Sequence, residues 1–167
     1  MAGNNFYSKE TIKHFRNPHN YGVIRNADGV GEAGNIVCGD VMSLYIKVKN
    51  DIITDIKFKT YGCAAAIATS SVITDLVKGK TINEVIKINK DNIIKILKRL
   101  PPIKIHCSVL AVDALSEAIY QYLKKNKKNI PKQLEEKHIR IEEGKRKVKA
   151  RYEGYLKLRK AEKKVSI

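Results

Sequence analysis

Residues 41–59 read VMSLYIKVKNDIITDIKFK, and this stretch decides the fold. Apolar and polar residues alternate from Val41 to Lys49 and again from Ile53 to Lys59, and the pair Asn50-Asp51 between them is typical of a turn. The pattern predicts an antiparallel hairpin with one apolar and one polar face. The residues expected on the apolar face are Leu44, Ile46, Val48, Ile56 and Phe58. Because the other face is polar, helices should cover only one side of the sheet.

Helical patterns lie on both sides of this hairpin. Before it, residues 7–16 have helical spacing with Ser8 as a cap, and residues 19–35 predict a loop with one short strand. After it, further helices are predicted over residues 64–78 (ending at Gly79), from a capping box at Thr81–Glu84, and over residues 91–99 and 108–124. This order predicts an α+β fold, in which a small antiparallel sheet of about three strands carries helices on one face.

The positive charge of the chain is concentrated at its C-terminal end. The whole sequence has a net charge of +16, and residues 124–167 hold 17 Lys or Arg against 6 Asp or Glu. We therefore divide the chain into a domain over residues 1–124 and a basic, helical or partly mobile extension over residues 125–167. Within the extension, two helical segments are predicted near 132–143 and 145–164, separated at Gly144.

The composition also bears on the cellular compartment. No apolar run approaches the roughly 18 residues of a membrane helix, and the first residues do not resemble an export signal. An odd number of cysteines argues against a disulfide framework, so we expect a cytoplasmic protein with reduced thiols and no membrane partner.

Three cysteines stand far apart in the chain, and none belongs to a Cys-x-x-Cys pair. They are separated by 25 and 44 residues, so only the fold could bring the three thiols together. Each cysteine has neighbours suited to metal chemistry or to a tight backbone. The motifs are Cys38-Gly39-Asp40, Tyr61-Gly62-Cys63-Ala64 and His106-Cys107-Ser108.

These residue types predict an open site for a thiophilic metal. Cys63 and Cys107 are expected where a loop enters a helix, and the N–H groups of a helix N-terminus favour the thiolate, which is both metal ligand and nucleophile. Asp40 would add a hard oxygen and His106 an imidazole beside the soft sulfurs. Such a mixed set suits an iron–sulfur cluster that must leave, and not a stable electron carrier.

Plainer interpretations exist for each residue. A single buried cysteine usually serves as a small apolar side chain. Asp40 alone is compatible with a turn or cap, His106 with a packed histidine, and Lys104 with a solvated charge after two prolines. The remaining histidines lack such neighbours and are assigned structural roles; they are His14, His19 and His138.

Taken together, these motifs resemble the IscU/NifU-type iron–sulfur cluster assembly scaffolds. The resemblance runs from Tyr7 to about Lys124. The His106-Cys107 pair, and the absence of an insertion between Pro102 and Cys107, favour the IscU branch. The matching stretches are Tyr7-Ser8, Asn17-Pro18, Cys38-Gly39-Asp40-Val41-Met42, Phe58-Lys59-Thr60-Tyr61-Gly62-Cys63, Ala66-Ile67-Ala68, Ser70-Ser71 and Leu100-Pro101-Pro102-Ile103-Lys104-Ile105-His106-Cys107-Ser108.

The resemblance implies a scaffold, not a turnover enzyme, on which a 2Fe–2S cluster is built from iron and sulfur and then passed to acceptor proteins. It implies that Cys107 accepts persulfide sulfur from a cysteine desulfurase and that Asp40 keeps the cluster labile. It also implies a homodimer as one arrangement of the cluster-bound form. The metal-site residues it implies are Cys38, Asp40, Cys63, His106 and Cys107. The residues it implies for binding an Hsp70/J-type chaperone pair are Leu100, Pro101, Pro102, Ile103 and Lys104.

The chain departs from the family pattern in three places. Residues 34–37 read Gly-Asn-Ile-Val where many relatives have Gly-Ala-Pro, no cysteine follows Cys107, and the basic tail from about Asn126 has no counterpart.

Two other function classes remain open on the residues alone. One is a structural zinc module, since three thiolates with His or Asp can complete a zinc site. The other, which we consider the weaker, is nucleic-acid binding through the basic tail.

Overall fold

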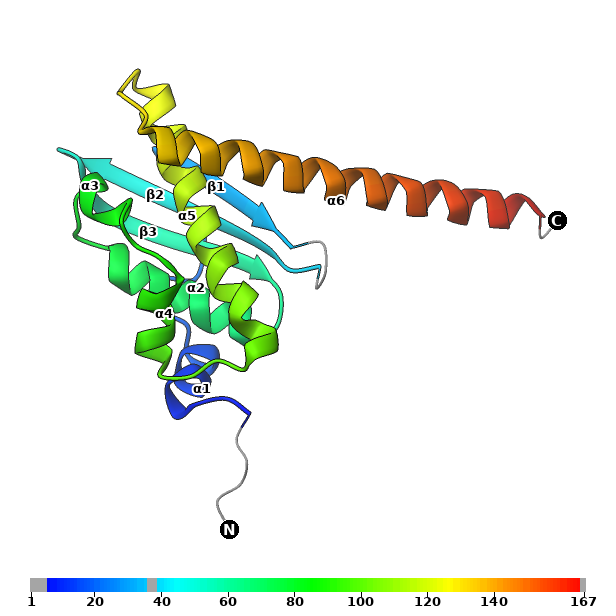
Figure 1. Ribbon diagram of the computed structural model, residues 1–167, viewed down its shortest axis with the longest axis horizontal. Helices are drawn as coiled ribbons and strands as arrows, with labels where there is room; N and C mark the ends of the chain where they lie inside the picture. The colour runs from blue at the N-terminus through cyan, green and yellow to red at the C-terminus, as the bar shows by residue number, and fades with distance from the viewer. Residues whose placement is uncertain (1–5, 36–38, 166–167) are drawn as a thin grey trace, which may run out of the picture.

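A three-stranded antiparallel sheet forms the centre of the molecule (Figure 1). The computed structural model describes residues 6–35 and 39–165, and side chains up to Glu153. The strands are β1 (Gly29–Gly34), β2 (Val41–Lys49) and β3 (Ile52–Tyr61), in the order β1-β2-β3. Leu44 lies opposite Phe58 and Ile46 opposite Ile56, as a hairpin requires. The predicted hairpin and the predicted short strand before it are confirmed.

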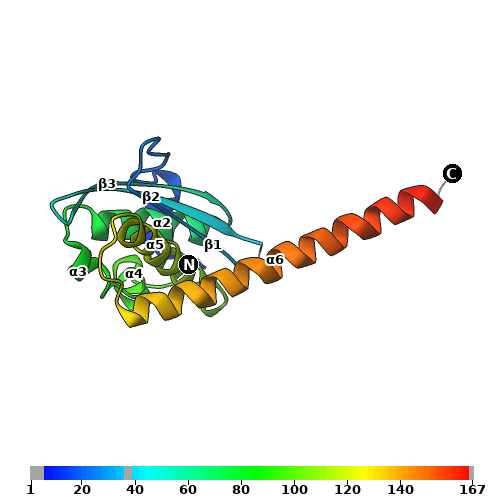
Figure 2. The same ribbon diagram turned by 90° about the horizontal axis from the view of Figure 1, so that it is seen from above.

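Helices cover one face of this sheet. Helix α5 packs on β1 and β2, and α2 packs on β3. Both helices lie on the same side of the sheet (Figure 2), where Met42, Leu44 and Ile46 of β2 are fully buried. The predicted α+β class is therefore confirmed. The helices are α1 (Lys9–Arg16), α2 (Ala64–Val77), α3 (Ile82–Val85), α4 (Lys90–Leu97), the 3₁₀ turn η1 (Pro102–Lys104), α5 (Ile105–Lys125) and α6 (Lys132–Val165).

The helix boundaries follow local signals in the sequence. The Ser8 side chain accepts a hydrogen bond from the N–H of Thr11, and Thr81 and Glu84 form a complete capping box. Gly79, at φ +84°, follows the end of α2 in the left-handed conformation predicted for it. Helix α5 begins at Ile105, three residues earlier than predicted, because η1 leads directly into it. Cys107 therefore lies in the first turn of α5.

Helix α5 and strand β1 make a close backbone contact between the two layers. A Cβ atom on Gly31 would lie 2.0 Å from the carbonyl oxygen of Ala114, and one on Gly29 would lie 2.2 Å from that of Ala118. The backbones of the helix and the strand therefore meet without intervening side chains. This contact fixes where α5 lies on the sheet, and with it the position of the first turn of α5 beside the start of β2.

The C-terminal extension is one continuous helix, α6, and not two segments. The predicted break at Gly144 is wrong, because one helical glycine costs only about 1 kcal/mol and its neighbours are good helix formers. The first part of α6 packs on α5 through buried Leu134 and Ile141, and the rest runs beyond the sheet (Figures 1 and 2). Among the described residues, no helix has the length and apolar character needed to cross a membrane.

Candidate metal centre

Two thiols from distant parts of the chain meet at one end of the sheet. Cys63 is the N-cap residue of α2, directly after β3, and Cys107 lies in the first turn of α5. Their sulfur atoms are 3.9 Å apart. Both lie at helix N-termini, where positive partial charge favours a thiolate. Cys38, the third predicted thiol, lies outside the described residues.

A carboxylate and an imidazole complete the cluster. The Sγ atom of Cys107 lies 3.8 Å from Oδ2 of Asp40 and 3.6 Å from Nε2 of His106. One ligand atom from each of these three residues lies within 4.8 Å of the others. Asp40 and Cys107 are buried, whereas Cys63 and His106 are half-buried, so the cluster is open to solvent on one side. Four of the five predicted site residues therefore converge.

Local backbone contacts hold Asp40 in place. The N–H of Asn35 donates to the carbonyl oxygen of Asp40 at 2.9 Å, which ties together the two ends of the segment between β1 and β2. On the other side, a Cβ atom on Gly62 would lie 3.0 Å from Cγ of Asp40 and 2.8 Å from Cβ of Ala66. A side chain at position 62 would force Ala66 or Asp40 to shift, so glycine here lets Asp40 lie this close to the N-terminus of α2.

Two further side chains, Lys104 and Tyr7, act on the charge of this site. The pKa of Lys104 is raised, chiefly because its ammonium group is attracted to the thiolate form of Cys63. The pKa of Tyr7 is raised, first by burial and then by the same thiolate. Lys104 was predicted only as a partner-binding residue. The position of Lys104 two residues before His106 could have placed it at the metal centre. No signal in the sequence placed Tyr7 there.

The donor set fits a thiophilic metal. Two soft sulfurs, one hard oxygen and one imidazole are ligands that iron and zinc both accept. The half-buried Cys63 and His106 leave the site accessible, as assembly or exchange of a metal requires. Which metal binds, and through which atoms, stays a prediction.

The histidines predicted to be structural make contacts outside this site. His14 shares a 2.8 Å hydrogen bond with the hydroxyl of Ser71, and His19 one of 2.6 Å with Asp75. His138 of α6 bonds to the buried carboxylate of Glu117 at 2.7 Å, stacked on a tyrosine of α5. The contacts of His14 and His138 join helices, and that of His19 joins the loop after α1 to α2. The structural roles of the three histidines stay a prediction.

The segment predicted to bind a chaperone lies directly before the site. Ile103 is 70% exposed and Pro102 is exposed, whereas Leu100 and Pro101 are buried. Lys104, at the end of η1, faces Cys63. The chaperone itself stays a prediction.

A small antiparallel sheet with thiols at two helix N-termini, beside a carboxylate and an imidazole, defines the class as an α+β domain with a candidate metal centre. The chain belongs to the family of NifU-like N-terminal domains, whose model matches residues 6–129. This confirms the family resemblance predicted from the motifs.

Curated relatives and solved structures agree with this assignment. The chain is 57% identical over 122 residues to "Iron-sulfur cluster assembly scaffold protein IscU 1" of Archaeoglobus fulgidus, covering 73% of this chain and 80% of that protein. It is 47% identical over 121 residues to the IscU scaffold of Aquifex aeolicus, covering 71% and 77%. A SUF-system scaffold from Fervidobacterium islandicum superposes with a TM-score of 0.58 at 27% identity, covering 68% of this chain and 96% of that chain. A NifU-like N-terminal protein from Brucella abortus shares the fold at 21% identity, with a TM-score of 0.61 and coverage of 71% and 94%.

Proposed function

We propose that this chain is a scaffold for iron–sulfur cluster assembly, which builds a cluster and passes it to acceptor proteins without being a turnover enzyme. The observation that carries this proposal is the convergence of Cys63, Cys107, Asp40 and His106 at an open end of the sheet. The family and the names of its curated members support it. We place the protein in the cytoplasm, where thiols stay reduced and able to bind metal.

The cargo we propose is a 2Fe–2S cluster held by Cys38, Cys63 and Cys107 together with Asp40 or His106. Thiolates suit iron–sulfur clusters, and an oxygen or nitrogen ligand in place of a fourth thiolate changes how firmly the cluster is held. The carboxylate of Asp40 lies 3.8 Å from the Cys107 sulfur, within reach of the same iron. In this proposal the hard oxygen of Asp40 makes the cluster easy to release.

Cys107 is the proposed acceptor of persulfide sulfur from a cysteine desulfurase. In this transfer the Cys107 thiolate would attack the outer sulfur of the desulfurase persulfide, whose S–S bond breaks so that the desulfurase cysteine leaves as a thiolate. The ammonium group of Lys104 at the same site favours anionic sulfur. The Cys107 side chain is buried whereas Cys63 is half-buried. Sulfur delivery to Cys107 therefore requires a local movement that exposes its thiol.

The partners we propose are the desulfurase, the acceptor proteins, and an Hsp70/J-type chaperone pair that binds Leu100–Lys104. The 70% exposure of Ile103 supports the last of these, because an exposed apolar side chain is available to a partner. A homodimer of the cluster-bound form is part of the same proposal.

Anaerobic reconstitution with ferrous iron and sulfide tests the proposal. We expect visible absorption from a bound cluster, and transfer of that cluster to an apo-ferredoxin. The variants Cys63→Ser and Cys107→Ser should lose most of the absorption, whereas His19→Gln, which removes an imidazole away from the site, should retain it. A wild-type protein that binds iron but transfers no cluster would refute the scaffold role.

A structural zinc site is the second candidate. The same two thiols, carboxylate and imidazole could complete a tetrahedral zinc site. Zinc content alone cannot separate the candidates, since a scaffold could hold zinc before iron arrives. Zinc that iron and sulfide fail to displace would favour the structural role.

A further inference from the structure

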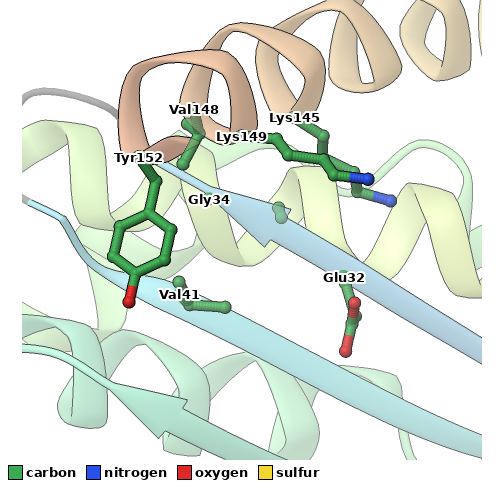
Figure 3. A pocket seen from close by; sticks show the side chains of 8 residues that line it. Glu32, Gly34, Val41, Lys145, Val148, Lys149 and Tyr152 are labelled. Atoms are coloured by element: carbon green, nitrogen blue, oxygen red, sulfur yellow. The ribbon is translucent and has the colours of Figure 1, made fainter. Parts of the chain in front are cut away.

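A groove lies between α6 and the ends of β1 and β2 (Figure 3). Its volume is about 250 Å³, enough for one large side chain or a few small ones. Figure 3 shows Val148 and Tyr152 of α6 on one side, with Val41 of β2 on the other. The lining residues are Glu32, Ala33, Gly34, Val41, Lys145, Val148, Lys149 and Tyr152.

The groove combines an apolar centre with a charged rim. Tyr152 is 62% exposed and Val41 is 40% exposed, so apolar surface faces solvent here. Lys145 and Lys149 line its α6 side, and Glu32 extends from β1. Apolar surface with a polar rim is typical of a protein-binding site.

This groove adjoins the proposed assembly site. Gly34 and Val41 are paired across β1 and β2, and they begin and end the segment that contains Asp40. The hydrogen bond from Asn35 to Asp40 lies directly beside that pair. A protein bound in the groove would therefore contact the base of the segment that supplies Asp40 to the metal site.

The net positive charge of α6 indicates which kind of partner fits the groove. Residues 145–165 contain ten Lys or Arg and two Glu, a net charge of +8. A second copy of this helix would bring like charges together, which is unfavourable. A nucleic acid would find cations on the rim, but its phosphates gain nothing from the apolar centre between Val41 and Val148. An acidic protein segment with one apolar side chain matches both parts of the groove.

We infer that the groove docks an acidic segment of a protein that exchanges sulfur or a cluster with the metal site. One apolar side chain of that segment fills the space between Val41, Val148 and Tyr152, and one flanking carboxylate pairs with Lys149. A second carboxylate reaches Lys145, whose ammonium group already holds Glu142 at 2.8 Å and can bind both carboxylates. The inference rests on the proposed scaffold function, because the groove's position matters only if cargo passes through the adjacent site.

The test uses the full chain and a short fluorescein-labelled peptide with one leucine flanked on both sides by Glu and Asp. Fluorescence anisotropy at about 150 mM salt reports binding while attraction between exposed charges farther apart than about 8 Å is largely screened. A second peptide, with serine in place of leucine, measures the contribution of charge alone. We expect the leucine peptide to bind about tenfold more tightly. In ¹H–¹⁵N spectra it should shift the amide signals of Gly34, Val41 and Val148.

Matched variants locate the binding. Tyr152→Ala should weaken binding of the leucine peptide about tenfold, whereas Ile139→Ala, which removes an apolar side chain 54% exposed on the same helix, should leave it unchanged. Lys149→Glu should weaken binding more than Lys147→Glu, because Lys147 does not line the groove. Circular dichroism checks that every variant retains its helices.

Three results would overturn the inference. They are equal binding of the two peptides, tighter binding of a single-stranded RNA that is insensitive to Tyr152→Ala, and self-association that the peptide does not disrupt. Cluster reconstitution is measured separately on the same variants. A Tyr152→Ala or Lys149→Glu variant that loses peptide binding but still reconstitutes the cluster confirms a docking role for the groove. Failure of the wild-type protein to reconstitute a cluster refutes the scaffold function itself.

Discussion

At the scale of single residues, Asp40 is the proposed ligand whose chemistry differs most from that of the thiols. It is buried beside Cys107 and offers oxygen among sulfur ligands. Replacing it with alanine should slow release of a reconstituted cluster at least about fivefold, equivalent to roughly 1 kcal/mol of activation free energy. The rate of transfer to an apo-ferredoxin measures this, with Asp55→Ala on β3 as control. An unchanged rate would show that Asp40 does not make the cluster labile.

The thiols should differ in reactivity. Cys63 is half-buried and attracts the ammonium group of Lys104, whereas Cys107 is buried. Iodoacetamide at pH 7.5 should therefore alkylate Cys63 faster than Cys107, as mass spectrometry of peptides can show. Lys104→Met should slow alkylation of Cys63 about two- to fivefold, because the positive charge that faces the reacting sulfur is then removed. Lys98→Met is the control, and an equal effect from it would remove the role assigned to Lys104.

At the scale of elements, two glycines test opposite consequences of an added methyl group. At Gly31 the new Cβ would collide with the α5 backbone, only 2.0 Å from a carbonyl oxygen, and the helix could not stay where it is. We expect Gly31→Ala to lower the free energy of unfolding by about 3 kcal/mol or more. At Gly144 no atom lies within 4 Å of an added Cβ, so Gly144→Ala should raise the free energy of unfolding by roughly 0.5–1 kcal/mol. Urea denaturation measures both, and a well-tolerated Gly31→Ala would contradict the packing described here.

The contact of α1 with α2 should make stability depend on pH through His14. Burial lowers the pKa of His14 below its ordinary value of 6.5, so the folded protein holds this imidazole neutral. Below pH 6.5 the unfolded chain binds a proton that the folded protein does not. The free energy of unfolding should thus fall as the pH drops from 6.5 through the lowered pKa, by up to about 1.4 kcal/mol per pH unit.

Urea denaturation at pH 7 and at pH 5.5 tests this dependence. His14→Gln should reduce the difference in stability between the two pH values, whereas His19→Gln should retain most of it. A His14→Gln variant with the full wild-type pH dependence would show that another group is responsible.

Elements with local signals were predictable, and contacts between distant elements were not. The alternation in residues 41–59 and the capping residues Ser8 and Thr81 act within a few positions, so they fixed strands and helix starts correctly. The start of α5 was predicted three residues late, because the 3₁₀ turn η1 continues directly into the helix. The meeting of Cys63 and Cys107, 44 residues apart, depends on how α2 and α5 pack on the sheet. For that pair the sequence showed residue types suited to metal binding and a family resemblance. It did not show that the two sulfur atoms lie close together.

At the scale of the whole molecule, the chain combines a domain shared with its family and a helix outside the family match. The family model ends at residue 129, three residues before α6 begins. The boundary predicted at residue 124 stays a proposal, because buried Leu134 and Ile141 attach the first part of α6 to the domain. The charge pattern set the extension apart by its composition, but the low helix propensity of Gly144 alone was too weak to end the helix.

The account depends most on one claim, that these converging side chains hold an iron–sulfur cluster. Mössbauer spectroscopy of the protein reconstituted anaerobically with ⁵⁷Fe and sulfide tests it most directly. We predict the signal of sulfur-bridged iron in the wild-type protein and its loss in Cys63→Ser and Cys107→Ser. Iron found only in an oxygen- and nitrogen-ligated form, or a cluster signal that survives both substitutions, would contradict the claim.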